Sequence, residues 1–83
     1  MDVRNELREM LRDVLSIGER ADALHDDSPL LGALPELDSM AVVTLIGTLE
    51  ERFGFTIDDD EIDASTFETV GTLVEFVRRK RAE

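Results

Sequence analysis

Apolar side chains recur at steps of three and four residues in three separate segments of this chain, and this spacing constrains its fold more than any other feature. Such a period places the apolar side chains on one face of an α-helix. It predicts amphipathic helices over residues 2–17 and 39–53, and a last helix that begins after Thr69. The expected inward-facing residues are Val3, Leu7, Met10, Leu11, Val14 and Leu15 in the first helix, Val42, Leu45, Ile46, Leu49 and Phe53 in the second, and Val70, Leu73, Val74 and Val77 in the last.

The residues that flank these segments have the chemistry of helix ends. Asp2 suits the start of the first helix and Gly18 its end. Asp38 is the expected N-cap of the second helix, which Gly54 ends, and Thr69 is the expected cap of the last. The three helices therefore have start and stop signals where the periodicity needs them.

The connections between the helices contain further apolar residues. Pro29 favours a helical turn over residues 29–34, which Pro35 would end. A short third helix is expected around residues 59–64, with Ile62 inward, and Phe67 is expected to fill the core. Five leucines should attach the long connection, residues 18–38, to the bundle: Leu24, Leu30, Leu31, Leu34 and Leu37. The predicted fold is all-α, a small four-helix bundle in one domain over residues 1–83.

Charge and composition exclude several function classes. The 83 residues include 20 acids and nine bases, for a net charge of −11. Such a surface repels nucleic acid and anionic lipid and favours partners with basic faces, although the charge could also serve solubility alone. The basic run at residues 78–81 is interpreted as compensation of a helix dipole.

Two absences narrow the chemistry and the location. The chain has no cysteine, so a thiol would have to come from a cofactor. No secretory signal is visible, and the longest nearly apolar run, residues 41–49, is shorter than the ~20 residues of a membrane helix. We expect a cytoplasmic monomer.

Ser39 is the main candidate for chemistry. It follows Asp38 at the start of a predicted helix, after a long loop, and the open N–H groups of a helix start attract anions such as a phosphodiester. A serine that merely belongs to a helix cap is the simpler interpretation of this position taken alone.

The wider sequence resembles acyl and peptidyl carrier proteins over residues 3–80. In that family a D-S-L or D-S-M motif opens the second helix, which ends in an E-E-x-F-G-like sequence, here residues 50–54. An isoleucine, an acidic stretch and a T-V-x-x-L-like helix start follow, here Ile57, residues 58–61 and residues 69–73. The resemblance implies that Ser39 carries 4′-phosphopantetheine, derived from coenzyme A, and that Asp38 lies where the phosphopantetheinyl transferase and its metal act.

By the same resemblance the protein is a carrier that holds acyl or aminoacyl groups as thioesters on the arm and presents them to partner enzymes, and it is not an enzyme. Its partners would be the transferase, an acyl-loading ligase or acyltransferase, and downstream acyl-processing enzymes. An enzyme that reaches an arm on Ser39 must approach along the second helix. Four residues of this helix are therefore predicted to recognise partners, Met40 and Val43 as apolar anchors and Glu50 and Glu51 as steering charges, with Glu36 and Asp38 adding charge upstream.

Three departures from the family pattern bear on the pathway. Glu36 stands where a glycine is usual, Ala41 where an acid is often found, and Gly47 at a surface position that is usually larger and apolar. They count against the housekeeping carrier of fatty acid synthesis. The Leu-Asp-Ser-Met form also occurs in specialised carriers, including D-alanyl carriers, and the run LLGALPELDSMAVV is similar to free-standing carriers associated with exopolysaccharide and exosortase systems.

Other functions have weaker support. A helical interaction module with an unmodified Ser39 is the main alternative, and a small serine hydrolase is a distant one, because His25 is the only histidine and no G-x-S-x-G motif exists. An EF-hand that begins at Asp58 would need glycine and glutamate where the chain has Asp63 and Thr69. No metal site is therefore predicted, although loose divalent binding by the acidic stretch stays open.

Overall fold

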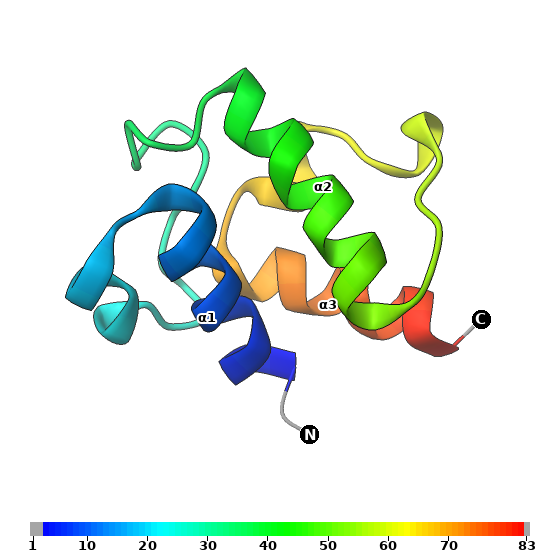
Figure 1. Cartoon of the computed structure of the whole chain (residues 1–83), viewed down its shortest axis with the longest axis horizontal. Coiled ribbons are helices and arrows are strands. Elements are labelled where there is room, and N and C mark those ends of the chain that lie inside the picture. The colour runs from blue at the N-terminus through cyan, green and yellow to red at the C-terminus, as the bar shows by residue number, and fades with distance from the viewer. Residues whose placement is uncertain (1–2, 83) are drawn as a thin grey trace.

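The structure is a computed structural model that describes residues 3–82, apart from the side chain of Asp59. Three α-helices, α1 (Val3–Leu15), α2 (Ser39–Phe53) and α3 (Val70–Ala82), alternate with three short 3-10 helices, η1 (Gly18–Ala23), η2 (Asp59–Glu61) and η3 (Ala64–Phe67). In Figure 1, α2 runs diagonally across the view, with α1 and α3 below it. The described residues form no strand, only one isolated bridge between Pro29 and Thr69. The all-α prediction is confirmed.

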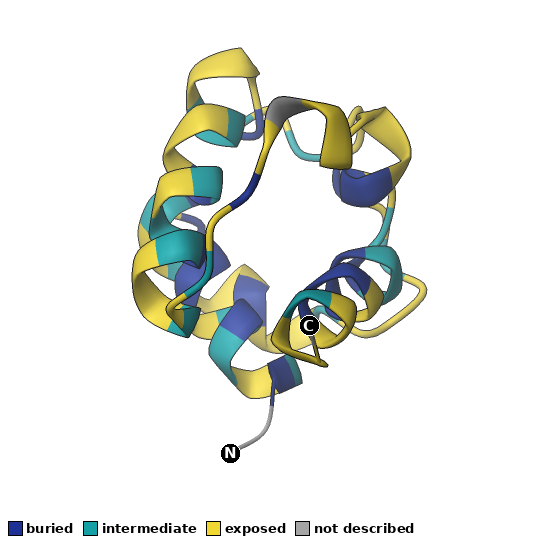
Figure 2. Ribbon diagram, turned by 90° about the vertical axis from the view of Figure 1, so that its right-hand side faces the viewer, coloured by how far each residue is buried: buried dark blue, intermediate teal, exposed yellow. Residues whose placement is uncertain are grey.

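The α-helices bury their apolar faces in one shared core. Figure 2 shows buried segments turned toward the interior and an exposed outer side on α2. Each fully buried leucine contributes about 1.5–3 kcal/mol to stability relative to an exposed one. Most of the residues that the helical period predicted to face inward are buried in this core. Its largest fully buried side chains are Leu7, Met10, Leu11, Leu30, Leu45, Leu49, Phe67, Val70, Leu73 and Val77.

The first helix is shorter than predicted. It ends at Leu15, because Ser16 adopts a left-handed backbone conformation with φ 54°. The chain turns there, and Ile17 is buried in the core. Gly18, the predicted stop, begins η1 instead. Asp2, the predicted first-turn residue, lies outside the described residues.

The two core phenylalanines of the prediction differ in burial. Phe67 is buried, as expected. Phe53 is only half-buried, and its ring stacks on Phe55 with the centroids 6.0 Å apart. The guanidinium carbon of Arg81 lies 5.7 Å from the centroid of the Phe53 ring. Phe53 therefore faces the core as predicted, but it is only partly buried and closes the edge of the core beside the end of α3.

The long connection is held by backbone hydrogen bonds to the start of α3. The N–H groups of Val70 and Gly71 donate to the carbonyl oxygens of Ser28 (3.1 Å) and Asp26 (2.8 Å). These N–H groups would otherwise be unsatisfied, as at any helix start. A Cβ atom at Gly71 would lie 2.9 Å from the Asp26 oxygen, so only glycine allows this approach. The path of the loop toward α2 is thus fixed from the opposite side of the bundle.

The leucines of this connection follow the prediction with one exception. Leu30 and Leu37 are buried, and Leu24 and Leu34 pack half-buried against the core. Leu31 is 40% exposed, so its predicted role in attaching the loop is wrong. The expected turn after Pro29 is present as a single turn and not as a helix.

The predicted short third helix is divided into η2 and η3. Ile62, between them, has an extended backbone and a half-buried side chain. Asp58 and Asp63 each begin one 3-10 helix with a capping box. Thr69 caps α3 as predicted, since its hydroxyl accepts a hydrogen bond from the N–H of Thr72 at 3.1 Å.

Candidate functional site

Ser39 is the first residue of α2, and it is exposed. The preceding residue, Asp38, is the N-cap, and its Oδ1 accepts a hydrogen bond from the N–H of Ala41 at 2.9 Å. The carbonyl oxygen of Asp38 accepts the first helical hydrogen bond, from the N–H of Val42 at 3.0 Å. Figure 1 shows this first turn at the edge of the molecule, away from the start of α1 and the end of α3. The helix start predicted from the sequence is confirmed.

The electrostatics at Ser39 suit a phosphate ester. The first N–H groups of a helix have no carbonyl partner within the helix, and the helix dipole is positive at this end. An anion attached to the Ser39 oxygen would lie close to these groups. The exposed hydroxyl and the open helix start are therefore compatible with a covalently bound phosphopantetheine.

The chain just before Ser39 is attached to both the core and η1. Leu37 is buried, and its N–H donates to the carbonyl oxygen of Leu34 at 3.0 Å. Glu36 forms an ion pair with Arg20 of η1. The hydrogen bond from Arg20 holds the pKa of the Glu36 carboxyl below its usual range. Glu36 is therefore a paired charge that anchors the loop, a role that the sequence did not indicate.

An apolar groove opens beside Ser39. Leu31 and Leu37 of the loop line it together with Val42 of α2, and Asp38 and Ser39 form its polar rim. The sequence missed this groove because Leu31 was expected to face the core. Only the path of the loop, which is fixed at α3, places Leu31 next to the start of α2.

The outer face of α2 holds three of the four predicted recognition residues in exposed positions. Met40 is 75% exposed and Val43 is 66% exposed, and Glu51 also faces solvent. Glu50 differs, because it is half-buried and its Oε2 accepts a hydrogen bond from the N–H of Ile57 at 2.7 Å. Glu50 thus fixes the chain after α2, whereas the other three residues are open to a partner.

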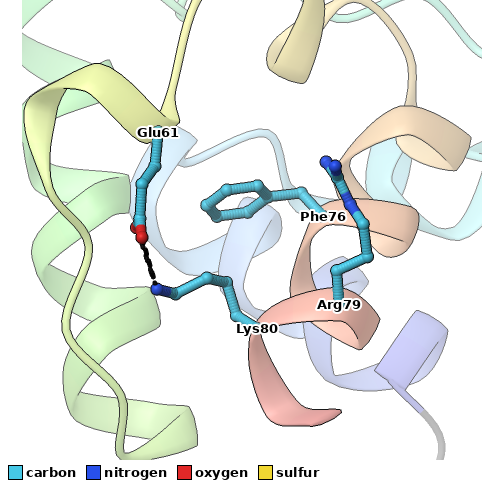
Figure 3. A pocket seen from close by; sticks show the side chains of 4 residues that line it. All are labelled: Glu61, Phe76, Arg79 and Lys80. Atoms are coloured by element: carbon cyan, nitrogen blue, oxygen red, sulfur yellow. Dashed lines mark hydrogen bonds and ion pairs between the residues drawn. The ribbon is translucent and has the colours of Figure 1, made fainter. Parts of the chain in front are cut away.

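A second pocket, between η2 and α3, has no predicted site residue in it. Figure 3 shows the Phe76 ring between Glu61 and Arg79, with Lys80 reaching across to Glu61. The Nζ atom of Lys80 donates to both carboxylate oxygens of Glu61 at 2.8 Å. These contacts attach η2 to the last turns of α3.

Two other features of the sequence were considered as functional sites, the single histidine and the acidic stretch after Ile57. His25 is exposed in the loop, and its Nδ1 accepts a hydrogen bond from the N–H of Asp27 at 3.3 Å. Within the part of the chain that the structure describes, no group of three or more His, Cys, Asp or Glu side chains is placed to hold a metal ion. The acidic stretch after Ile57 is used instead for the caps of η2 and η3.

The sequence of this chain matches a known protein family over most of its length. The family model described as a phosphopantetheine attachment site matches residues 5–77. The chain belongs to the acyl carrier protein family. Members of this family are carriers that bear acyl groups on a covalent 4′-phosphopantetheine arm and that interact with biosynthetic enzymes.

Individual relatives support the same assignment over nearly the whole chain. This carrier is 34% identical to an acyl carrier protein of Desulforapulum autotrophicum, covering 96% of this chain and 99% of the relative. It is 28% identical to an acyl carrier protein of Chlamydia trachomatis, covering 98% and 99%. The solution NMR structure of a holo acyl carrier protein from Nitrosomonas europaea covers 100% of both chains, with 53% identity and a TM-score of 0.92. Across residues 3–82 of this carrier, no helix is long and apolar enough to cross a membrane.

Proposed function

We propose that Ser39 is the residue to which the phosphopantetheine arm of this carrier is attached. The observation that carries the proposal is the exposed Ser39 side chain at the first position of α2, directly after the N-cap Asp38. In the attachment step the Ser39 oxygen forms a bond to the phosphorus of the phosphopantetheine part of coenzyme A. The bond from that phosphorus to the departing adenosine bisphosphate breaks, and a base of the transferase takes the hydroxyl proton.

The chain itself contributes position and not a catalytic group. The arm supplies the thiol that the cysteine-free sequence lacks, and an acyl group is held on it as a thioester. A tethered acyl group is present at high effective concentration for any enzyme that docks nearby. Absence of enzymatic activity is part of this proposal. The one histidine supports it, because the Nδ1 atom of the exposed His25 ring accepts a hydrogen bond from the backbone N–H of Asp27, while the Ser28 hydroxyl accepts one from the backbone N–H of His25.

Partners would dock along the outer face of α2. Met40 and Val43 offer apolar contact next to Ser39, and Glu51 adds charge farther along the helix. A basic enzyme surface would be steered toward such a face. We propose a phosphopantetheinyl transferase, an acyl-loading ligase or acyltransferase, and downstream acyl-processing enzymes as partners of a cytoplasmic monomer, with residues 1–83 acting as one domain.

The proposal is tested by incubating wild-type protein and the Ser39→Ala variant with coenzyme A and a broad-specificity phosphopantetheinyl transferase. Intact mass spectrometry should show one phosphopantetheinyl group on the wild type and none on the variant. An unmodified wild-type protein, in a reaction that modifies another carrier, would favour the alternative of a helical interaction module without an arm.

A further inference from the structure

Leu31 is an exposed leucine on a fixed backbone. Its N–H donates to the carbonyl oxygen of Phe67 at 3.0 Å, and the N–H of the neighbouring Leu30 donates to the backbone carbonyl oxygen of Glu68 at 2.9 Å. Leu30 itself is fully buried, whereas Leu31 is 40% exposed. Its exposure therefore does not come from a loose loop, because the hydrogen bonds to the segment before α3 hold the side chain at the surface.

The exposed side of Leu31 forms one wall of the groove beside Ser39. Leu37 and Val42 complete the apolar lining, and Ser39 stands at the rim. Any group attached to the Ser39 oxygen thus begins at the mouth of an apolar surface. Apolar groups that enter this groove leave water, which is favourable in proportion to the area buried.

We propose that this groove binds the pantoyl part of the phosphopantetheine arm, with its geminal methyl groups against Leu31 and Val42. The inference rests on attachment at Ser39. The chemical order of the arm supports the occupant, because the geminal dimethyl carbon is the first apolar centre after the phosphate. The phosphate stays at the start of α2, where the open N–H groups favour an anion.

The acyl cargo is a poorer fit for this groove than the arm. It is bound to the thiol at the far end of the arm, so it would have to fold back past the amide groups to reach Leu31. The groove therefore fixes the beginning of the arm, whatever cargo the thiol carries. The thiol end remains available to enzymes that dock on the outer face of α2.

The test is NMR spectroscopy of the holo protein prepared with coenzyme A. Nuclear Overhauser effects are expected between the pantoyl methyl protons and the side-chain methyls of Leu31 and Val42. The two pantoyl methyl resonances should also differ from those of free coenzyme A. Leu31→Asp should remove the contacts and return these resonances toward the free positions. Ala33→Asp introduces the same charge at an exposed residue of the same turn that does not line the groove, and it should leave the resonances unchanged.

The experiment distinguishes failure of the groove proposal from failure of the proposed attachment at Ser39. Intact mass spectrometry of the same sample reports whether Ser39 carries the arm. If the arm is attached and its pantoyl methyls show free-coenzyme resonances, or contacts only to residues outside the groove, the groove proposal is overturned and the attachment stands. A sample that never gains the arm contradicts the proposed function itself.

Discussion

The carboxylate of Glu50, near the end of α2, accepts a hydrogen bond from the backbone N–H of Ile57, seven residues later. Between them Gly54 ends the helix in a left-handed conformation with φ 74°, and its N–H donates to the carbonyl oxygen of Glu50. Glu50 therefore joins the last turn of α2 to the segment that leads to η2. Glu51, its neighbour, is exposed.

This difference predicts unequal costs of removing the two acids. Glu50→Ala should destabilise the fold by about 1–3 kcal/mol, because it leaves a part-buried N–H group without its charged acceptor. Glu51→Ala should change the stability by less than about 0.5 kcal/mol, as for other surface substitutions. Urea unfolding of both variants measures the difference. Equal losses would show that the contact with Ile57 contributes nothing specific.

Two substitutions separate the role of Asp38 as a helix cap from the role of its charge. Asn caps helices about as well as Asp, so Asp38→Asn should keep the melting temperature, while Asp38→Ala should lose about 1 kcal/mol. That loss corresponds to a fall of roughly 4–8 °C in a domain of this size.

The rate of phosphopantetheine attachment to the Asp38→Asn variant then measures the effect of the Asp38 charge alone. We expect Asp38→Asn to be modified more slowly than wild type despite an intact fold, because under the proposed attachment at Ser39 the transferase would act beside this carboxylate. An unchanged rate would restrict Asp38 to capping.

Glu51 tests steering by the outer face of α2. Glu51→Lys should slow attachment several-fold at low salt, and the gap should close as salt rises, because charges on a surface are screened. Glu9→Lys is the matched control, since it changes the net charge equally from an exposed position on α1. If both variants slow attachment to the same extent, net charge guides the encounter instead of a docking face.

The contact between Lys80 and Glu61 predicts that the stability of the fold depends on pH. The hydrogen bond from Lys80 holds the pKa of the Glu61 carboxyl below its usual value of 4.5. Because the pKa is lower in the folded chain than in the unfolded one, the resulting stability is present above pH 4.5 and is lost as the pH falls through the folded pKa.

Lys80→Met should raise the pKa of Glu61 toward 4.5 and reduce the loss of stability below that pH. Carboxyl carbon chemical shifts in a pH titration report this change directly. Arg79→Met, a change in the neighbouring base, is the control and should leave the pKa of Glu61 where it is. A Glu61 pKa that is insensitive to Lys80→Met would contradict the ion pair.

The sequence predicted those features that depend on local chemistry. The pairing of Asp38 with Ser39 at a helix start follows from capping preferences within four residues, and Thr69 at the start of α3 follows from the same rule. The buried faces of the helices follow from their period. Local signals therefore located the candidate site.

Contacts between distant segments were not predictable in the same way. The approach of Asp26 to Gly71 fixes the long loop, and with it the exposure of Leu31, yet no pattern in either segment specifies the other. Glu50 has the composition of a surface acid, and only the turn after α2 brings the Ile57 N–H to it. These long-range contacts decide the groove and the division of roles on α2.

Attachment at Ser39 is tested most directly by locating the arm in the wild-type protein. After modification with coenzyme A and transferase, the protein is digested and the peptides are fragmented in a mass spectrometer. We predict the phosphopantetheinyl group on Ser39 alone, with Ser39→Ala unmodified and its melting temperature nearly unchanged, because Asp38 and not Ser39 caps the helix. A group located on Ser28 or Ser65, or persisting in Ser39→Ala, would contradict the account.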